Sequence, residues 1–207
     1  MKRLKHDQAE PTAIVLAAGR GERFGGLKQL EELYGATILE RVLRTVGKQD
    51  WHYSPLLVLG HGEKKIKEAL DLDGFRVISN DNPDVGLSSS LKAGVRKTRP
   101  GTGGYIFFLG DMPLISKETV NSVLNTARAG ASIAAPFYEE ERGFPVYLSR
   151  SWKKDLLEAE GDRGARKIIA ANRERVTRIP TGDRGTVMDI NRPADVDEAR
   201  QYLEKED

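Results

Sequence analysis

Blocks of apolar and polar positions alternate along the first 130 residues of the chain. Short continuous apolar runs, such as TAIVLAA at 12–18, are separated by stretches with apolar residues at helical spacing, such as TILERVLRTVGKQ at 37–49. The first pattern predicts strands covered on both faces, and the second predicts amphipathic helices. The predicted strands cover residues 12–18, 55–60, 75–80 and 104–110. The predicted helices cover residues 37–49, 63–72, 88–98 and 116–130.

The pattern is less regular in the second half. Two strand-like runs, 132–138 and 144–149, flank the acidic loop EEERG and are expected to pair. Two helices broken at Gly161 follow, and then two short strands and a C-terminal helix. These elements are predicted over residues 151–174, 175–180, 186–190 and 193–206.

Strand–helix alternation of this kind predicts an α/β fold. We expect a single Rossmann-like, three-layer domain with a mainly parallel central sheet, helices on both faces and a small antiparallel element in the second half. The expected boundaries are a flexible leader over residues 1–11 and one domain over residues 12–207.

Composition excludes several classes of protein. Thirty-three Lys and Arg stand against thirty-one Asp and Glu, and the two signs are interleaved, which argues against a nucleic-acid-binding surface. The chain has no cysteine, so a disulfide framework, a thiolate zinc site and a cysteine nucleophile are excluded. The charged N-terminus lacks the apolar core of a secretory signal, and no apolar run is long enough to span a bilayer. We therefore expect a cytoplasmic protein with no nucleic-acid or membrane partner.

A glycine-rich loop at 19–27 follows the first predicted strand and leads to Lys28. Ligands of open parallel sheets bind beyond the carboxyl ends of the strands, and glycine N–H groups can surround an anion there. The glycine spacing departs from both the dinucleotide fingerprint and the Walker A loop. From the glycines alone, a phosphate-binding loop and a tight turn with solvated charges remain equally open.

Two further segments carry candidate metal ligands. Asp111 directly follows the predicted strand 104–110, where a carboxylate is costly unless it is paired or binds a metal. Asp189 lies on the predicted strand 186–190, and Asn191 lies two residues later, just past its end. Because side chains alternate along a strand, the two are expected to point to the same side. Mg²⁺ prefers one or two carboxylates together with phosphate oxygens. The alternative is that these residues cap a turn and the helix after Pro193.

Three consecutive serines at 88–90 stand at the start of a predicted helix. Capping of that helix accounts for one hydroxyl and leaves two for a ligand. Three histidines are present, and each lies in the leader or beside a loop, so we expect them at the surface.

The chain resembles molybdenum cofactor cytidylyltransferases from about residue 13 to 200. These enzymes belong to a nucleotidyltransferase superfamily that also includes the guanylyltransferase of the same cofactor. The matching segments, in the order of the family, are LAAGRGERFGGLK, GLSSSLKAG, LGDMP, RGFPV, GDRGAR and DINRPAD. Phe144 departs from the family pattern, in which a histidine or asparagine is frequent at that position.

The resemblance implies a role for each matching residue. Those implied for the nucleotide are Leu16, Ala17, Ala18, Gly19, Gly21, Arg23, Lys28, Gly86, Ser88 and Ser89. Those implied for the acceptor are Arg142, Gly143, Pro145, Arg163 and Arg166. The implied catalytic residues are Lys28, Asp111 and Arg23, and the implied metal ligands are Asp111 with Asp189 or Asn191. Ala18 stands where guanylyl relatives tend to have glycine, which favours cytidine.

The implied reaction joins CMP from CTP to the terminal phosphate of molybdopterin and releases pyrophosphate. The implied cofactor is Mg²⁺, with Mn²⁺ as a substitute, and a molybdenum hydroxylase is the implied client. Two alternatives remain: a cytidylyl- or guanylyltransferase for another phosphorylated acceptor, and a non-catalytic protein that delivers the cofactor to a molybdoenzyme.

Overall fold

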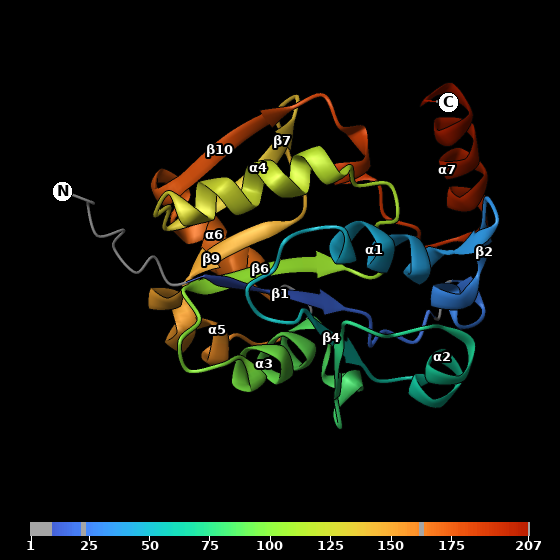
Figure 1. Cartoon of the computed structure of the whole chain (residues 1–207), viewed down its shortest axis with the longest axis horizontal. Coiled ribbons are helices and arrows are strands. Elements are labelled where there is room, and N and C mark those ends of the chain that lie inside the picture. Colours follow the sequence, from blue (N-terminus) through green and yellow to red (C-terminus); the bar gives the residue numbers. More distant parts are fainter. Residues whose placement is uncertain (1–9, 22–23, 162–163, 207) are drawn as a thin grey trace.

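A computed structural model describes residues 10–21, 24–161 and 164–206 of the chain (Figure 1). Its strands are β1 (Pro11–Leu16), β2 (Glu32–Leu33), β3 (Ala36–Thr37), β4 (Leu56–Leu59), β5 (Arg76–Ser79), β6 (Gly104–Leu109), β7 (Ile133–Tyr138), β8 (Glu141–Arg142), β9 (Val146–Ser149) and β10 (Val176–Thr181). Its α-helices are α1 (Ile38–Gly47), α2 (Glu63–Ala69), α3 (Leu87–Lys97), α4 (Lys117–Arg128), α5 (Lys153–Glu158), α6 (Arg166–Ala171) and α7 (Pro193–Glu206). Short 3₁₀ turns are η2 (Lys28–Leu30), η3 (Pro83–Val85), η4 (Arg150–Trp152), η5 (Arg173–Arg175) and η6 (Arg184–Val187).

The main sheet has eight strands in the order β10-β7-β9-β6-β1-β4-β5, with β8 paired to β7. β1 lies parallel between β6 and β4, and Val15 is in register with Phe108 on one side and Leu57 on the other. β9 runs antiparallel to both of its neighbours, β6 and β7. The expected mainly parallel sheet with a small antiparallel element is therefore confirmed.

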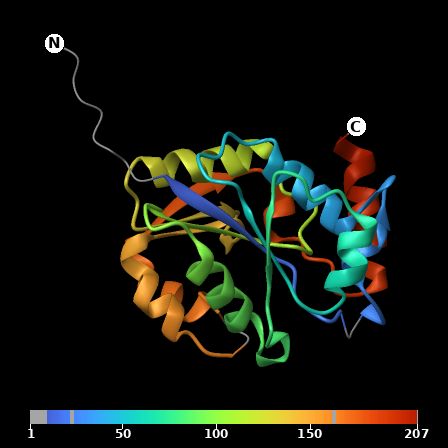
Figure 2. The same cartoon turned by 60° about the horizontal axis from the view of Figure 1, so that its bottom comes forward.

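Helices cover both faces of this sheet (Figure 2). Ala13 and Val15 of β1 pack toward α1, α2 and α4, whereas Ile14 and Leu16 pack toward α3, α5 and α6. Because both faces are buried, the strand reads as a continuous apolar run rather than an alternating one.

The predicted boundaries of α4 are confirmed by its capping contacts. The Ser116 hydroxyl accepts a hydrogen bond from the Thr119 backbone N–H, which satisfies one of the free donors of the first turn. Gly130, just past the helix, has a φ of 91°, which glycine adopts without strain.

A third, smaller core joins α7 to the β2–β3 hairpin beyond one end of the sheet (Figure 1). Leu33, Leu114 and Ile190 are buried there against Val196 and Ala199 of α7. The C-terminal helix thus fixes the segment that precedes it, which carries two candidate metal ligands.

The predicted strand at 186–190 is wrong. The structure has the 3₁₀ turn η6 followed by an extended segment outside the sheet. The Thr186 hydroxyl donates to the Asp183 carbonyl, and the Ile190 N–H donates to the Asp111 carbonyl, so the segment follows the sheet edge instead of adding a strand. In the part of the chain that the structure describes, no helix is long and apolar enough to cross a bilayer.

Candidate active site

A cavity of about 640 Å³ opens beyond the carboxyl ends of β1 and β6. It is formed by the loop after β1, the loops after β4 and β6, the start of α3 and the segment before α7. The lining residues that the sequence predicted are Leu16, Ala17, Ala18, Gly19, Gly21, Lys28, Gly86, Asp111, Arg166, Asp189 and Asn191.

The loop after β1 is shaped by one glycine that no other residue can replace without strain. Gly21 has a φ of 68°, and a Cβ placed on it would lie 2.3 Å from the Gly26 carbonyl oxygen. The Gly21 carbonyl accepts from the N–H groups of Phe24 and Gly25, which turns the chain back toward Lys28. The turn thus has a structural role and also delivers a cation to the cavity.

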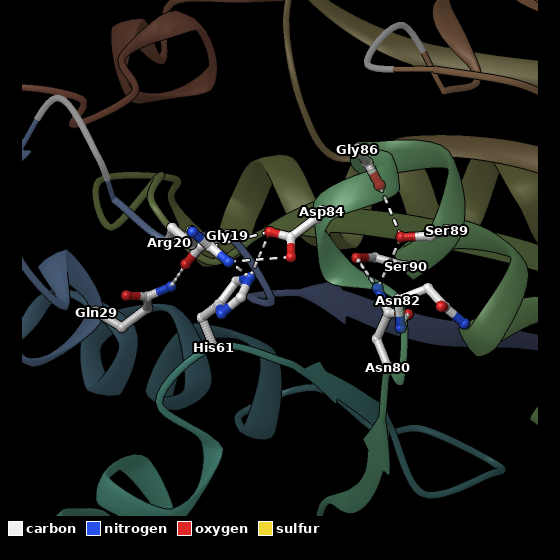
Figure 3. A network of polar contacts seen from close by, with 10 residues as sticks. All are labelled: Gly19, Arg20, Gln29, His61, Asn80, Asn82, Asp84, Gly86, Ser89 and Ser90. Atoms are coloured by element: carbon white, nitrogen blue, oxygen red, sulfur yellow. Dashed lines mark hydrogen bonds and ion pairs between the residues drawn. The ribbon is translucent and has the colours of Figure 1, made fainter.

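Gln29 holds the same loop from beneath (Figure 3). Its side-chain amide donates to the carbonyls of Ala17 and Gly19 at 3.2 and 2.9 Å, and the residue is buried. Because these carbonyls are occupied by Gln29, the loop has a fixed conformation before any ligand arrives. Sequence reasoning missed Gln29, since no motif marked a polar residue after Lys28.

Lys28 lies among three oxygen atoms at the sheet edge. Its Nζ is 2.6 Å from Asp111 Oδ2, 2.9 Å from the Ile190 carbonyl oxygen and 3.1 Å from Asn191 Oδ1. The Lys28 side chain is 11% exposed and that of Asp111 is 21% exposed, so solvent screens this ion pair only weakly. The structure therefore brings together the predicted catalytic and metal-binding residues of three distant segments.

This cluster fits a magnesium-type ion that also binds phosphate oxygens. Asp111 Oδ1 is buried and has no hydrogen-bond partner among the described residues. Within the described ranges, no group of three or more His, Cys, Asp and Glu side chains is placed to hold a metal by itself. A carboxylate and an amide oxygen are hard ligands that leave most coordination positions for water and substrate, as Mg²⁺ prefers.

Asp189 and Asn191 contact one another although the predicted strand is absent. Asn191 Nδ2 donates to Asp189 Oδ2 at 2.6 Å, so the amide oxygen faces Lys28. The backbone N–H of Asn191 donates to Asp195 at the start of α7. These contacts orient Asn191 toward Lys28, while Asp189 also lines the cavity.

A polar network crosses one rim of the cavity (Figure 3). The Asp84 carboxylate accepts from Arg20 at 3.0 Å and lies 2.8 Å from His61 Nε2, and Arg20 Nε lies 2.9 Å from the same His61 nitrogen. The hydrogen bond with His61 and then the charge of Arg20 lower the pKa of the Asp84 carboxyl. The expectation that His61 is simply a surface residue is corrected, because it lines the cavity.

The serine prediction also needs correction. Ser88 is 1% exposed and lies off the cavity, and the Ser89 hydroxyl donates to the Gly86 carbonyl and accepts from Asn80. The serine that lines the cavity is Ser90, the next residue on the same helix. None of the three caps α3, whose N-cap is Gly86.

Two of the predicted acceptor residues, Arg142 and Arg166, line a small apolar cavity, and Arg166 also lines the large one. Arg142 Nη1 is buried and unpartnered among the described residues, and burial followed by the charge of Arg166 lowers the pKa of this guanidinium. Gly143 packs against Thr186, and Pro145, which is joined to Phe144 by a cis peptide bond, directly precedes β9. The predicted residues Arg23 and Arg163 lie outside the described residues.

Comparison with known proteins gives three findings. The family model described as the MobA-like NTP transferase domain matches residues 13–176. A probable molybdenum cofactor guanylyltransferase from Methanosarcina acetivorans is 33% identical over 158 residues, which cover 72% of this chain and 67% of that protein. Nicotine blue oxidoreductase from Paenarthrobacter nicotinovorans is 28% identical over 87% of this chain and 91% of its own length.

One solved structure with a similar fold contains manganese. The structure of Rv0371c from Mycobacterium tuberculosis in complex with manganese has a TM-score of 0.74 and 26% identity, and the match covers 94% of this chain and 98% of that one. The match to the family model spans most of the chain and includes the glycine loop, Lys28 and Asp111. The chain therefore belongs to the family of MobA-like NTP transferase domains.

Proposed function

We propose that this protein transfers CMP from CTP to the terminal phosphate of molybdopterin and releases pyrophosphate. The observation that carries the proposal is the cluster of Lys28, Asp111 and Asn191 beside the glycine loop. A cation, a buried carboxylate and free backbone N–H groups at one sheet edge suit a triphosphate with a bound divalent metal.

The reaction needs alignment and charge neutralisation more than proton transfer. An oxygen of the acceptor phosphate forms a bond to the α-phosphorus of the nucleotide, and the bond from that phosphorus to the oxygen bridging to the β-phosphate breaks. A phosphate monoester has a second pKa of about 6, so this nucleophile is largely dianionic at neutral pH. A general base is unnecessary, and the protein must bring two polyanions together.

Each element of the cavity contributes to that task. The N–H groups of residues 18–21 would bind the triphosphate, since these residues line the cavity, and Lys28 would stabilise the charge that develops at the α-phosphorus. Asp111 and Asn191 would hold Mg²⁺ or Mn²⁺, which supplies a Lewis acid for the phosphate oxygens when bound. The predicted contribution of Arg23 to the leaving pyrophosphate is part of the same proposal.

The acceptor side is assigned to Arg142, Gly143, Pro145, Arg163 and Arg166. Arg142 carries a buried guanidinium N–H group with no partner among the described residues, and Arg166 lines both cavities. A phosphorylated acceptor entering between the cavities would satisfy both cations. The product would then pass to a molybdenum hydroxylase as client.

Cytidine is favoured by Ala18, which stands at the base of the loop. A Cβ placed on Gly60 would lie 2.9 Å from Ala18 Cβ, so the alanine occupies the space beside β4 that Gly60 leaves open. The archaeal relative named as a probable guanylyltransferase makes GTP the alternative donor. Another phosphorylated acceptor and a non-catalytic delivery role remain the competing functions.

The test is pyrophosphate release from CTP, GTP, ATP and UTP with Mg²⁺, in the presence and absence of molybdopterin. We expect release from CTP that requires molybdopterin. Asp111→Asn should lower turnover at least roughly a hundredfold, about 3 kcal/mol, because it removes charge that acts on the transition state. Asp73→Asn, an exposed aspartate between α2 and β5, is the matched control and should leave turnover unchanged.

Each other outcome points to a different function. Release from GTP alone would assign the protein to guanylyl transfer. Cofactor binding with no release from any nucleotide would support the delivery role. Because one relative is named an oxidoreductase, oxidation of NADH or NADPH is measured in parallel, and turnover there would overturn the proposal.

A further inference from the structure

The Lys28 ammonium has no hydrogen-bond donor left for a substrate. An ammonium group has three N–H donors, and three protein oxygens lie within 3.1 Å of this one. The oxygens belong to a carboxylate, a backbone carbonyl and a side-chain amide. A lysine that must contact phosphate during the reaction is therefore fully occupied elsewhere in this structure.

Contacts that do not involve Lys28 fix the backbone of the two segments and the Asn191 side chain. The Ile190 N–H donates to the Asp111 carbonyl at 2.9 Å, which ties the two segments together. The Asn191 amide is oriented by Asp189, and its backbone N–H is bound by Asp195. The three oxygen atoms would stay close together if the Lys28 ammonium left. They would then form a site that contains only hydrogen-bond acceptors.

Such a set of oxygens is chemically a site for a hard cation. We infer that Lys28 is a resident cation in the metal site of the nucleotide-free protein, and that the divalent metal enters by exchange with its ammonium. The inference rests on the proposed function, from which it takes the metal site, and it adds Lys28 as the occupant and the Ile190 carbonyl as a further oxygen of that site.

The exchange couples the metal to the nucleotide. When the Lys28 ammonium leaves Asp111, it loses an ion pair that is only partly exposed to solvent. This loss is unfavourable unless another anion is present to bind the ammonium. The triphosphate supplies that anion, so nucleotide binding favours the form of the protein in which the metal site is open. The coupling is reciprocal, since each ligand raises the affinity for the other by the same factor.

The experiment measures Mn²⁺ binding to the nucleotide-free protein by electron paramagnetic resonance of the free ion. Lys28→Met removes the resident cation and keeps most of the side-chain volume. If Lys28 has left the metal site in about a tenth of the wild-type molecules, this variant should bind Mn²⁺ roughly tenfold more tightly than the wild type. Lys65→Met is the control for loss of one positive charge, because Lys65 is exposed on α2, and it should match the wild type within about twofold.

A second variant covers the case in which the methionine disturbs folding. Lys28→Gln keeps a hydrogen-bond donor but removes the charge, and it should also bind Mn²⁺ more tightly than the wild type. If both Lys28 variants bind Mn²⁺ with the wild-type affinity, the exchange is overturned, while pyrophosphate release by the wild type still supports the proposed function. If no protein binds Mn²⁺ at all, the metal site itself is overturned.

Discussion

The orientation of one side-chain amide decides which atom of the segment before α7 faces the metal site. Asn191 directs Oδ1 toward Lys28 because its Nδ2 is bound by Asp189. Without that acceptor the amide could turn over and present two N–H donors instead of an oxygen. We therefore propose that Asp189 is a positioning residue and that Asn191 is the metal ligand of the two.

Asp189→Ala should therefore weaken metal use more than turnover. We expect the Mg²⁺ concentration for half-maximal pyrophosphate release to rise roughly tenfold or more, which is the usual cost of removing the partner of a metal ligand. Turnover at saturating Mg²⁺ should stay close to the wild-type value. Asp197→Ala, an exposed aspartate of α7 paired with Arg200, should change neither quantity. An unchanged Mg²⁺ requirement in Asp189→Ala would contradict the positioning role.

Single residues of the site were predictable where a motif marked them and not where only a tertiary contact does. Lys28, Asp111 and Asn191 stand next to strand ends or in family motifs, and the structure brings them together. Gln29 and Ser90 adjoin predicted residues, yet their roles depend on side-chain directions that the sequence does not show. Spacing alone also left Asp189 and Asn191 equivalent, whereas in the structure only Asn191 contacts Lys28, and Asp189 accepts from its amide.

At the level of elements, the hairpin of β7 and β8 is held against η6 by a glycine. The Gly143 N–H donates to the Pro136 carbonyl, and the next N–H, that of Phe144, donates to the Thr186 carbonyl. A Cβ on Gly143 would lie 2.6 Å from Thr186 Cβ and from the Thr186 carbonyl oxygen. The close approach of these two backbones leaves no room for a side chain.

Gly143→Ala is expected to lower the free energy of unfolding by about 1–3 kcal/mol, the range for forcing extra atoms into a packed site. Urea unfolding followed by circular dichroism measures the change. Gly182→Ala is the matched control, since a Cβ there would meet no atom within 4 Å, and it should stay within about 0.5 kcal/mol of the wild type. If the two variants have the same free energy of unfolding, η6 can move away from residue 143 without loss of stability.

Most elements were predictable because their patterns are set by burial on the sheet. Continuous apolar runs marked β1, β4 and β6, and helical spacing marked α1 and α4. The segment at 186–190 has a strand-like composition, but its apolar side chain Ile190 is buried against α7 instead of in the sheet. The local sequence pattern indicates that a residue is buried, but it does not show against which element the residue packs.

For the whole molecule, the proposed site predicts a stabilisation that depends on two ligands together. A ligand present at 100 times its dissociation constant adds about 2.7 kcal/mol to the free energy of unfolding. For a protein of this size, that corresponds to a rise in Tm of about 5–10 °C. We expect this rise with CTP and Mg²⁺ together and a clearly smaller one with GTP and Mg²⁺ or with either ligand alone. Equal shifts with both nucleotides would remove the preference assigned to Ala18.

The antiparallel strand β9 joins the two halves of the main sheet. It lies between β6 and β7, so the nucleotide half of the sheet and the half with β7 and β10 meet only through a strand that comes late in the chain. A fragment ending after α4 would keep the glycine loop and Asp111 but expose the whole apolar edge of β6, and such an edge invites pairing with other chains. A change of acceptor specificity between relatives would therefore have to come from side-chain substitutions around a retained β9. Neither a truncated first half nor a first half fused to an unrelated second half would keep this strand in place.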